Sequence, residues 1–485
     1  MSVYKNILGD LLLAERHIAE PCLKFTSDSR RVTPGCGFAA ICGSALDGHD
    51  FIPAALEKGA ALIVMEKEVP LPEGTPSLLV KDGAAAFALL VRHSAGEPDL
   101  ALKLLGVTGT NGKTTTAFLL EHIFNAAKRP WGLVSTVEYR TGKRVIPGER
   151  TTPDSQTLFS LFAEMKERGL AGAAMELSSH ALVQHRAAGI SLAAGIFTNL
   201  TGDHLDYHGT MENYFQAKKQ LFTRYLASDG TAIINCDDPW GERLCRELEG
   251  KMKILAFSME NKGNCRIRAC ELQSTGVKFT LEYPGGVIDV SSHLAGLYNV
   301  RNLTGALLAA LSLGLTAADI QKALALPVRV PGRLEAYPLP GGGTAYVDYA
   351  HTDDALVNVL QSVRQITPGR VNVLFGAGGD RDRSKRPRMG QAAAQYGDFL
   401  YITSDNPRSE EPEAIIADIL SGVPAGTAFE VILSRGEAVA RALERCGAGD
   451  ALVIAGKGHE NYQEIKGVKH PFSDIEEIKS FISGK

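Results

Sequence analysis

Short apolar runs that end in polar or glycine-rich clusters recur through the middle of the chain. Such runs are typical of parallel strands buried on both faces, and the carboxyl ends of these strands carry the ligand site. They predict a parallel sheet in this part of the chain. The runs cover residues 102–107, 172–175, 194–197 and 231–234.

The same pattern restarts after a stretch with two prolines and a glycine, residues 326–332, which predicts a linker. Beyond it, apolar runs alternate with helical segments and predict a second α/β region with a mostly parallel sheet. Before residue 100, short strands accompany an Ala-rich helix over 83–94. We therefore predict an α/β protein of three domains, at 1–100, 101–331 and 332–485. The later runs are 345–347, 371–375, 399–403 and 451–454.

A glycine-rich turn follows the first central run and precedes helical spacing over 115–127. Its backbone N–H groups can form a nest for phosphate oxygens, its lysine can reach the β and γ phosphates, and its first threonine can bind Mg²⁺. The strict pattern would have glycine where this chain has Val107. An ordinary glycine turn would explain the glycines but not the Lys-Thr-Thr. The segment is Gly109, Thr110, Asn111, Gly112, Lys113, Thr114 and Thr115.

Charged groups cluster after the next two runs. Glu176, at the end of the second run, suits Mg²⁺ coordination beside a phosphate loop. Residues 199–208 are dense in Asp and His, which fits either a metal site or a solvated loop with capping Asp. In the amphipathic segment 214–222, Lys218 and Lys219 taken singly predict surface charges. A second glycine cluster, 376–381, fails the dinucleotide pattern, and its arginine is better read as an anion contact.

Composition narrows the function classes. The 485 residues are 45% hydrophobic and 22% charged, with a formal net charge of −4. This charge argues against a broad nucleic-acid surface but leaves room for a local basic pocket. The eight cysteines form no C-x-x-C pair and have no histidine cluster, which favours reduced thiols over a zinc site. The apolar run 11–13 is too short for a signal peptide, and no stretch reaches the roughly 18 apolar residues of a membrane span. We expect a cytoplasmic protein.

Several spaced motifs together resemble the Mur ligase family, in order along nearly the whole chain. The resemblance implies three domains: an N-terminal one for a uridine nucleotide, a central ATPase domain and a C-terminal Rossmann-like domain. Within the family, residues 26–30, 376–381 and 404–408 are most similar to members that add the third residue, a diamino acid, to UDP-N-acetylmuramoyl-L-alanyl-D-glutamate. The family motifs lie at 108–115, 176–180, 199–208, 298–302, 331–335 and 348–352.

The resemblance implies an ATP-dependent ligase of peptidoglycan precursor synthesis, acting through an acyl phosphate. ATP is a co-substrate, and the catalytic set is Lys113, Glu176, His204 and Lys218. Two Mg²⁺ ions are implied, with Thr114, Glu176, His204 and a CO₂-derived carbamate on Lys218 as ligands. The family's modified lysine aligns with Lys218, and Lys219 is only one position away. Nucleotide contacts beyond the loop are implied at Asn299, Arg333 and Asp348.

Two substrate sets also follow from the resemblance. The UDP-linked muramoyl dipeptide is implied at Ser27, Ser29, Ser44, Ala45, Leu46, Thr151, Thr152, Ser178, Gln184 and Arg186. Arg150 stands where the family often has Asn. The diamino acid is implied at Arg381, Asp405, Asn406, Pro407, Arg408, Gly456 and Glu460. We expect small-molecule substrates only, no nucleic acid, no membrane insertion and a monomer.

The far end of the diamino acid decides specificity. Meso-2,6-diaminopimelate has a second carboxylate there, which the guanidinium of Arg408 can bind with two hydrogen bonds, and lysine has none. With lysine, Arg408 would face an ammonium group. Taken alone, Arg408 is better explained as a surface arginine after a proline turn. The alternatives are a lysine-adding ligase, a folate polyglutamate ligase, against which residues 28–30 argue, and a phosphate-loop switch or motor without a small-molecule acceptor.

Overall fold

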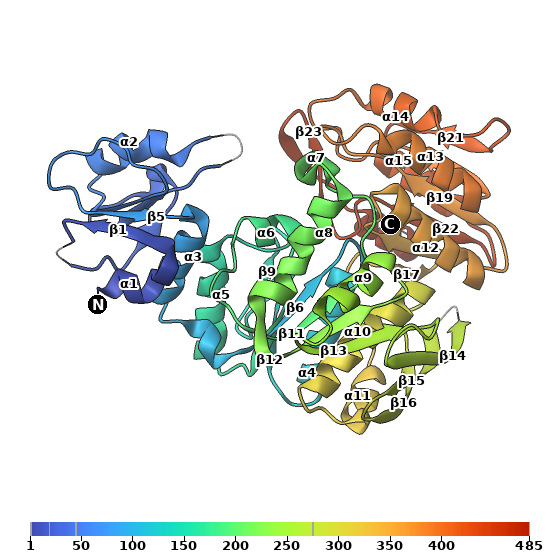
Figure 1. Ribbon diagram of the computed structural model, residues 1–485. Coiled ribbons are helices and arrows are strands. Elements are labelled where there is room, and N and C mark those ends of the chain that lie inside the picture. The colour runs from blue at the N-terminus through green and yellow to red at the C-terminus, as the bar shows by residue number, and fades with distance from the viewer. Residues whose placement is uncertain (1, 19, 44–45, 274–275, 485) are drawn as a thin grey trace.

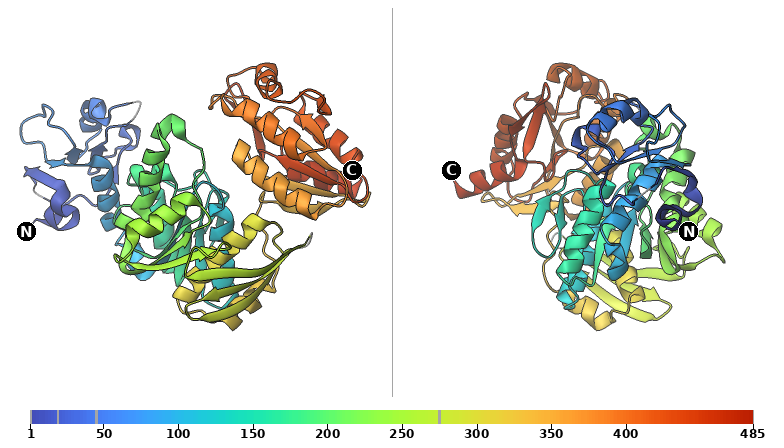
Figure 2. Two further views of the ribbon diagram at one scale, coloured as in Figure 1. Left: turned by 45° about the vertical axis from the view of Figure 1, so that its right-hand side comes forward. Right: turned by 90° about the vertical axis from the view of Figure 1, so that its left-hand side faces the viewer.

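The computed structural model describes residues 2–18, 20–43, 46–273 and 276–484. Within these ranges the chain forms three successive α/β units on sheets of five, 11 and six strands, plus a two-stranded hairpin. The first and third units lie at opposite ends of the middle unit (Figure 1, Figure 2). The predicted α/β fold class, with largely parallel sheets, is confirmed.

The first unit has the strand order β1-β5-β4-β3-β2, in which only β1 runs antiparallel to its neighbour. β3 and β4 are buried at every residue, as expected of apolar parallel strands covered on both faces. The elements are α1 (Val3–Leu8), η1 (Gly9–Leu11), β1 (Leu12–Arg16), β2 (Phe25–Thr26), η2 (Ser29–Arg31), β3 (Gly37–Ala40), η3 (Gly48–Phe51), α2 (Ile52–Glu57), β4 (Leu62–Met65), β5 (Ser77–Val80), α3 (Gly83–Ser94) and η4 (Pro98–Ala101).

The middle unit places β6 (Lys103–Thr108) between β10 (Gly172–Glu176) and β11 (Leu192–Phe197), with all three strands parallel. The full order is β16-β15-β14-β13-β12-β11-β6-β10-β7-β8-β9. Because the carboxyl ends of parallel strands meet at one edge, the loops after β6, β10 and β11 converge there. The chain reaches this edge at the glycine-rich loop, at Glu176 and at the Asp- and His-rich stretch.

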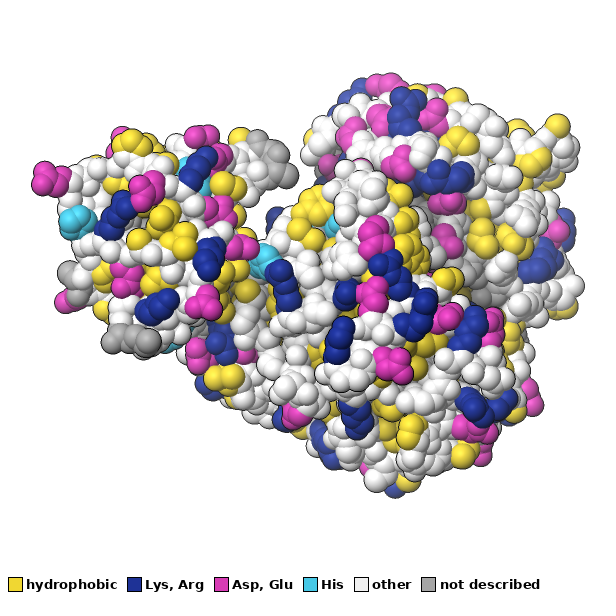
Figure 3. All heavy atoms as spheres, viewed as in Figure 1, with side chains coloured by type: hydrophobic (Ala, Val, Ile, Leu, Met, Phe, Trp, Pro, Cys, Tyr) yellow, Lys and Arg dark blue, Asp and Glu magenta, His cyan; other side chains and the backbone are white. Residues whose placement is uncertain are grey.

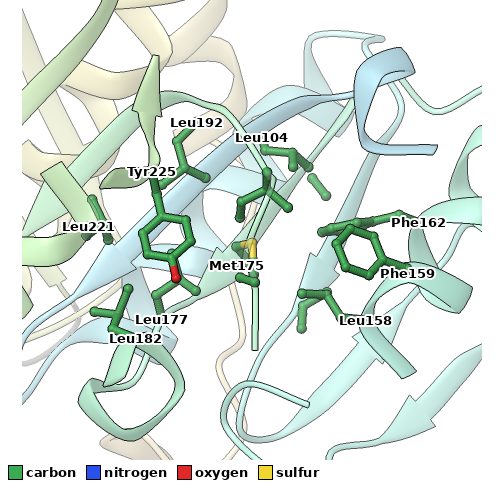
Figure 4. Close-up of a cluster of buried hydrophobic side chains, with 14 of the residues drawn as sticks. Leu104, Leu158, Phe159, Phe162, Met175, Leu177, Leu182, Leu192, Leu221 and Tyr225 are labelled. Carbon is green, nitrogen blue, oxygen red and sulfur yellow. The ribbon is translucent and has the colours of Figure 1, made fainter. Parts of the chain in front are cut away.

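Helices cover both faces of this sheet and bury its apolar side chains. On one face, Leu104 and Met175 of the strands pack against Phe159 and Phe162 of α5 (Figure 4). On the other, α4 and α10 pack together over the sheet. This packing fixes the strands whose ends carry the site. The remaining elements are α4 (Lys113–Ala126), β7 (Trp131–Val134), β8 (Glu138–Arg140), β9 (Val145–Pro147), α5 (Ser155–Glu167), α6 (Ser179–Val183), α7 (Leu205–His208), α8 (Met211–Gln220), the π-helical turn η5 (Leu221–Tyr225), β12 (Leu226–Asn235), α9 (Pro239–Leu248), β13 (Lys253–Ser258), β14 (Cys265–Gln273), β15 (Gly276–Tyr283), β16 (Gly286–Ser292), α10 (Leu297–Ser312) and α11 (Ala317–Leu324).

The third unit has the order β17-β18-β22-β19-β20-β21, parallel except for β17. The predicted linker, 326–332, has no helix or strand. The elements are β17 (Glu335–Pro338), β18 (Thr344–Asp348), α12 (Asp353–Ile366), β19 (Val371–Phe375), α13 (Lys385–Tyr396), β20 (Phe399–Ile402), α14 (Pro412–Leu420), β21 (Phe429–Val431), α15 (Arg435–Glu444), β22 (Ala451–Ala455), β23 (Tyr462–Ile465), β24 (Val468–Pro471) and α16 (Asp474–Ser483).

The surface is notched between the first and third units, and the middle unit forms the floor of the notch (Figure 3). Basic and acidic side chains are intermixed over this face. Among the described helices, none has both the length and the apolar character required to cross a bilayer.

Candidate active site

The glycine-rich loop turns between β6 and α4, and two of its glycines admit no side chain. Gly109 has φ +148°, and a Cβ there would lie 1.9 Å from Oγ1 of Thr198. Gly112 has φ +87°, and its Cβ would lie 2.3 Å from Oδ1 of Asn302. Val107, which departs from the strict phosphate-loop pattern, is a buried residue of β6. The turn therefore begins after position 107, where the strict pattern has glycine.

Lys113 lies back over this loop. Its Nζ donates hydrogen bonds to the carbonyl oxygens of Gly109 (2.9 Å) and Thr110 (2.8 Å). Burial lowers the pKa of Lys113, and the nearby carboxylates of Glu176 and Asp203 oppose that shift. The lysine is thus held against the loop, and it lines the cavity described next.

A cavity of about 450 Å³ opens between the middle and third units. It brings together most of the predicted nucleotide and metal residues, with Thr151 of the predicted substrate set, from four segments of the middle unit and two of the third; Gly109 and Lys218 do not line it. Asn299 lies outside its lining, buried in α10, where it accepts a hydrogen bond from Nδ2 of Asn302 (3.1 Å). The predicted residues that line the cavity are Thr110, Asn111, Gly112, Lys113, Thr114, Thr115, Thr151, Glu176, His204, Arg333 and Asp348.

Arg333 connects the two units across this cavity. Its Nη2 donates to Oγ1 of Thr114 (3.0 Å), and its guanidinium lies 4.8 Å from the ring centre of Tyr349. Asp348 is buried at the end of β18 and accepts hydrogen bonds from the backbone N–H groups of Leu334 (2.7 Å) and Ala350 (2.8 Å). Burial raises the pKa of Asp348, against the attraction of Arg333. A cation and a carboxylate of the third unit therefore border the phosphate loop.

The predicted metal ligands offer oxygen and neutral nitrogen donors. Glu176 is fully buried and accepts hydrogen bonds from the backbone N–H (2.8 Å) and the hydroxyl (3.2 Å) of Thr136. The backbone N–H of His204 donates to Asp203 (2.9 Å). Burial lowers the pKa of His204 to about 4, so its imidazole is neutral near pH 7 and can offer a lone pair to a metal. The carboxylate of Glu176 and the hydroxyl of Thr114 are oxygen donors of the kind that Mg²⁺ prefers, and the imidazole of His204 adds a nitrogen donor on the same cavity wall.

The two adjacent lysines of α8 have different surroundings. Lys218 is buried, and its Nζ donates to the carbonyl oxygen of Gly109 (2.7 Å) and lies 4.4 Å from the ring centre of Tyr214. Burial, and then the charge of Lys113, hold the pKa of Lys218 well below its usual value. Lys219 instead pairs with Glu247 (2.6 Å). The prediction of a surface charge is therefore wrong for Lys218, because α8 turns that side chain under the phosphate loop.

A depressed pKa also bears on the implied carbamate. Only an unprotonated amine can attack CO₂, and burial of Lys218 favours that form. The side chain touches the loop that carries the predicted phosphate contacts. The residue thus fits the modification that the resemblance implies.

The predicted muramoyl-peptide residues meet at the edge of the sheet. Arg186 donates to the carbonyl oxygen of Thr152 (2.8 Å) and to Oε1 of Gln184 (2.7 Å), and the Thr152 hydroxyl accepts from the backbone N–H of Ser178 (3.1 Å). The uridine set lies apart, in the first unit. There Ser27 is exposed, Ser29 is half-buried and Leu46 is 69% exposed. Ser44 and Ala45 lie outside the described residues.

The predicted amino-acid residues follow three neighbouring strands of the third unit. Asp405, Asn406, Pro407 and Arg408 come after β20, Gly456 and Glu460 after β22, and Arg381 after β19, where it is exposed. Asn406 donates to Glu460 through Nδ2 (2.9 Å). A Cβ on Gly456 would lie 2.5 Å from Oδ2 of Asp405, so the carboxylate rests on that glycine. This set is brought together except at Arg381, whose side chain makes no hydrogen bond or ion pair with the part of the chain that the structure describes.

Arg408 has a left-handed backbone, with φ +51°. Its backbone N–H donates to Glu464 (3.1 Å), and its carbonyl oxygen accepts from Lys466 (2.7 Å). The Nη1 atom donates to the carbonyl oxygen of Gly379 (2.6 Å), and Nε lies 3.5 Å from a carboxylate oxygen of Glu464. The guanidinium is therefore fixed along one edge, and 24% of its side chain is exposed.

Two residues of these sites, Lys457 and Asp354, were not predicted from the sequence. Lys457 is fully buried and donates to Asn406 (3.0 Å) and to Glu460 (2.9 Å). Its position in the sequence, between the predicted contacts Gly456 and Glu460, is the feature that could have indicated it. Asp354 lines the cavity and contacts the phosphate loop. It follows the 348–352 motif by two residues.

A separate group of potential metal ligands lies in the first unit, within the described ranges. Ligand atoms of Cys42, Asp47 and His49 are within 4.8 Å of one another. Glu66 donates its backbone N–H to Nε2 of His49 (3.1 Å), so the imidazole proton lies on Nδ1, which faces Asp47 at 2.7 Å. A protonated nitrogen cannot ligate a metal, and this group therefore does not make a zinc site. All eight cysteines are free thiols.

Comparison with known proteins finds similarity along most of the chain. Residues 25–94 match the Mur ligase family catalytic domain, 107–310 the Mur ligase middle domain and 332–458 the Mur ligase glutamate ligase domain. The chain is 41% identical over 472 residues to the UDP-N-acetylmuramoyl-L-alanyl-D-glutamate–2,6-diaminopimelate ligase of Geobacter metallireducens, covering 93% of this chain and 92% of the relative. It is 43% identical over 462 residues to the same-named enzyme of Chlorobaculum tepidum, covering 93% and 90%.

Solved structures agree with the observed architecture. A structure titled as a UDP-N-acetylmuramoyl-L-alanyl-D-glutamate–2,6-diaminopimelate ligase aligns with a TM-score of 0.71 at 33% identity, covering 100% of this chain and 99% of that one. The MurF ligase of Thermotoga maritima in complex with ADP aligns with a TM-score of 0.63 at 20% identity, covering 96% and 99%. The second similarity is one of fold alone.

Proposed function

The chain belongs to the Mur ligase family, and from this membership we propose that it joins meso-2,6-diaminopimelate to UDP-N-acetylmuramoyl-L-alanyl-D-glutamate. It is an ATP-dependent carboxylate–amine ligase that serves peptidoglycan precursor synthesis. The observation that carries the proposal is the end-to-end match to enzymes named for these two substrates. We propose that residues 1–100 bind the uridine nucleotide, 101–331 bind ATP and 332–485 bind the amino acid. The protein would act as a cytoplasmic monomer.

The reaction must convert a carboxylate, which is a poor acylating agent, into an acyl phosphate. Transfer of the γ-phosphoryl group of ATP to the D-glutamyl carboxylate does this, and the amine then displaces phosphate through a tetrahedral intermediate. The loop N–H groups and Lys113 would hold the phosphates, with Arg333 approaching from the third unit. Catalysis is then mostly positioning and charge neutralisation.

Thr114, Glu176 and His204 would hold Mg²⁺, because all three line the same cavity and offer donors that suit it. Bound there, Mg²⁺ would neutralise charge on the transferring phosphoryl group. Lys218, carbamylated beneath the loop, would add a carboxylate-like ligand for a second ion. Its burial and depressed pKa support this role.

The amino-acid site would lie among Asp405, Asn406, Arg408 and Glu460. Arg408 is held by its backbone and by Gly379, with its guanidinium partly exposed, so it can receive the far carboxylate of diaminopimelate. Lys457, buried between Asn406 and Glu460, would keep their side chains in place. Lysine lacks the far carboxylate, and its ammonium would meet a guanidinium, which disfavours the lysine-adding alternative.

Release of phosphate from ATP tests the proposal. With the UDP-linked dipeptide and diaminopimelate both present, we expect sustained release, and omission of either substrate should abolish it. Release that depends on neither substrate would instead indicate a phosphate-loop switch. Equal release with lysine would indicate the lysine-adding ligase.

A further inference from the structure

Asp354, in the first turn of α12, connects the third unit to the phosphate loop itself. Its Oδ2 atom accepts hydrogen bonds from Nδ2 of Asn111 (3.0 Å) and from the hydroxyl of Thr201 (2.9 Å). Asn111 belongs to the loop and Thr201 to the segment after β11. Two donors of the middle unit therefore converge on one carboxylate oxygen of the third unit.

Both donors are fixed within the middle unit before they reach this carboxylate. The backbone N–H of Asn111 donates to Oδ1 of Asn199 (2.9 Å), and its carbonyl oxygen accepts from the hydroxyl of Thr198 (2.6 Å). The backbone N–H of Thr201 donates to Oγ1 of Thr110 (3.0 Å). The contact therefore depends on the conformation of the phosphate loop, and a change in that loop would move both donors.

A local role in the helix does not account for this arrangement. Acidic residues in the first turn stabilise a helix through its dipole, and α12 has two of them, Asp353 and Asp354. Asp353 pairs with Nε of Arg388 (2.7 Å), inside the third unit. Only Asp354 of this pair reaches the middle unit. The two neighbours share a helix turn and a charge but differ in their partners.

We infer that Asp354 is a positioning residue that clasps the third unit onto the phosphate loop when the two units close. The inference rests on the proposed function in one respect: the amine held by the third unit must reach an acyl phosphate formed beside that loop. Asp354 does not touch reacting atoms in this account. It fixes the distance and angle between the two sites, on which the rate of such a transfer depends steeply.

The kinetic test compares Asp354→Ala with Asp353→Ala in the full chain. We expect kcat to fall about 10–100-fold in Asp354→Ala, as loss of the two charge-assisted hydrogen bonds from the middle unit implies; the variant also loses a longer one from Nδ2 of Asn358, within α12 (3.3 Å). The KM for the UDP-linked dipeptide should stay within about twofold, because its predicted contacts lie in the first and middle units. Asp353→Ala should match the wild type within about twofold, and Asp354→Asn, which keeps an acceptor oxygen, should recover part of the rate. Equal kcat values for the two alanine variants would overturn the inference.

A double-mutant cycle with Thr201→Val tests the contact directly. Thr201→Val should slow the wild type and have little further effect in the Asp354→Ala background, in which the hydroxyl has no carboxylate to donate to. Additive effects would mean that the two residues do not act through each other.

Small-angle scattering separates this inference from the proposed ligase reaction. With a non-hydrolysable ATP analogue and no amine, Asp354→Ala should have a larger radius of gyration than the wild type and Asp353→Ala. That outcome would support the clasp even if diaminopimelate proved not to be the substrate. Identical radii for all three proteins would overturn it.

Discussion

Replacing Arg408 with alanine should selectively impair use of diaminopimelate. A hydrogen bond to a charged group contributes about 1.5–3 kcal/mol. The value for Arg408 should lie in the lower half of that range, because Glu464 already compensates part of its charge and Gly379 occupies one edge of the guanidinium. A loss of about 1.5–2 kcal/mol corresponds to a roughly 10–30-fold fall in kcat/KM for diaminopimelate.

Steady-state kinetics with each substrate varied in turn measure this effect. The KM for ATP should change less than about twofold, and Arg408→Lys, which keeps the charge but loses the planar fork, should fall between wild type and Arg408→Ala. Arg383→Ala is the matched control, because Arg383 pairs with Asp418 and its side chain is 65% exposed. If Arg408→Ala behaved like Arg383→Ala, or raised the KM for ATP as much as that for diaminopimelate, the specificity argument would be wrong.

Three further outcomes are expected. Lys218→Ala should lose nearly all turnover, and added bicarbonate should not restore it, whereas Lys219→Ala should stay active. An active Lys218→Ala would exclude a carbamate role. Arg333→Ala should raise the KM for ATP about tenfold or more in an ATP titration, since it loses a charge-assisted contact at the phosphate loop, and an unchanged KM would contradict the contact. Burial lowers the pKa of His459 to about 4, below the unfolded value of about 6.5. Between about pH 6.5 and pH 4 the unfolded chain therefore binds more protons than the folded one, and the free energy of unfolding falls as the pH is lowered. His459 alone should account for a loss of about 2 kcal/mol at pH 5. In thermal unfolding, His459→Gln should therefore lose less stability than the wild type between about pH 8 and pH 5. The control His470→Gln, at an exposed position, should lose as much stability as the wild type.

The central parallel strands of the two larger sheets could be predicted from the sequence, because parallel strands buried on both faces appear as unbroken apolar runs. The outer antiparallel strands, among them β8, β9, β15 and β16, were not predicted. The run 172–175 lies in β10 and the run 371–375 coincides with β19. The phosphate loop could also be predicted, since only glycine tolerates the backbone of Gly109 and Gly112. In such segments the local sequence determines the local structure.

Residues whose roles depend on tertiary packing were harder to predict. Lys218 and Lys219 are adjacent on one amphipathic helix, and nothing local says which one α8 turns inward. Lys457 is buried only because β20 and β22 bring Asn406 and Glu460 together around it. Asp354 gains its significance from a contact between units that are far apart in sequence, for which no local pattern exists.

The most direct test of the account is a competition between amines. The full-length protein would be given ATP, Mg²⁺, the UDP-linked dipeptide and equal concentrations of meso-diaminopimelate and L-lysine, and the products would be identified by mass. We predict that the diaminopimelate adduct dominates by more than about tenfold, as repulsion between Arg408 and the lysine ammonium implies. A product that contains mainly lysine, or ATP turnover without either adduct, would contradict the account.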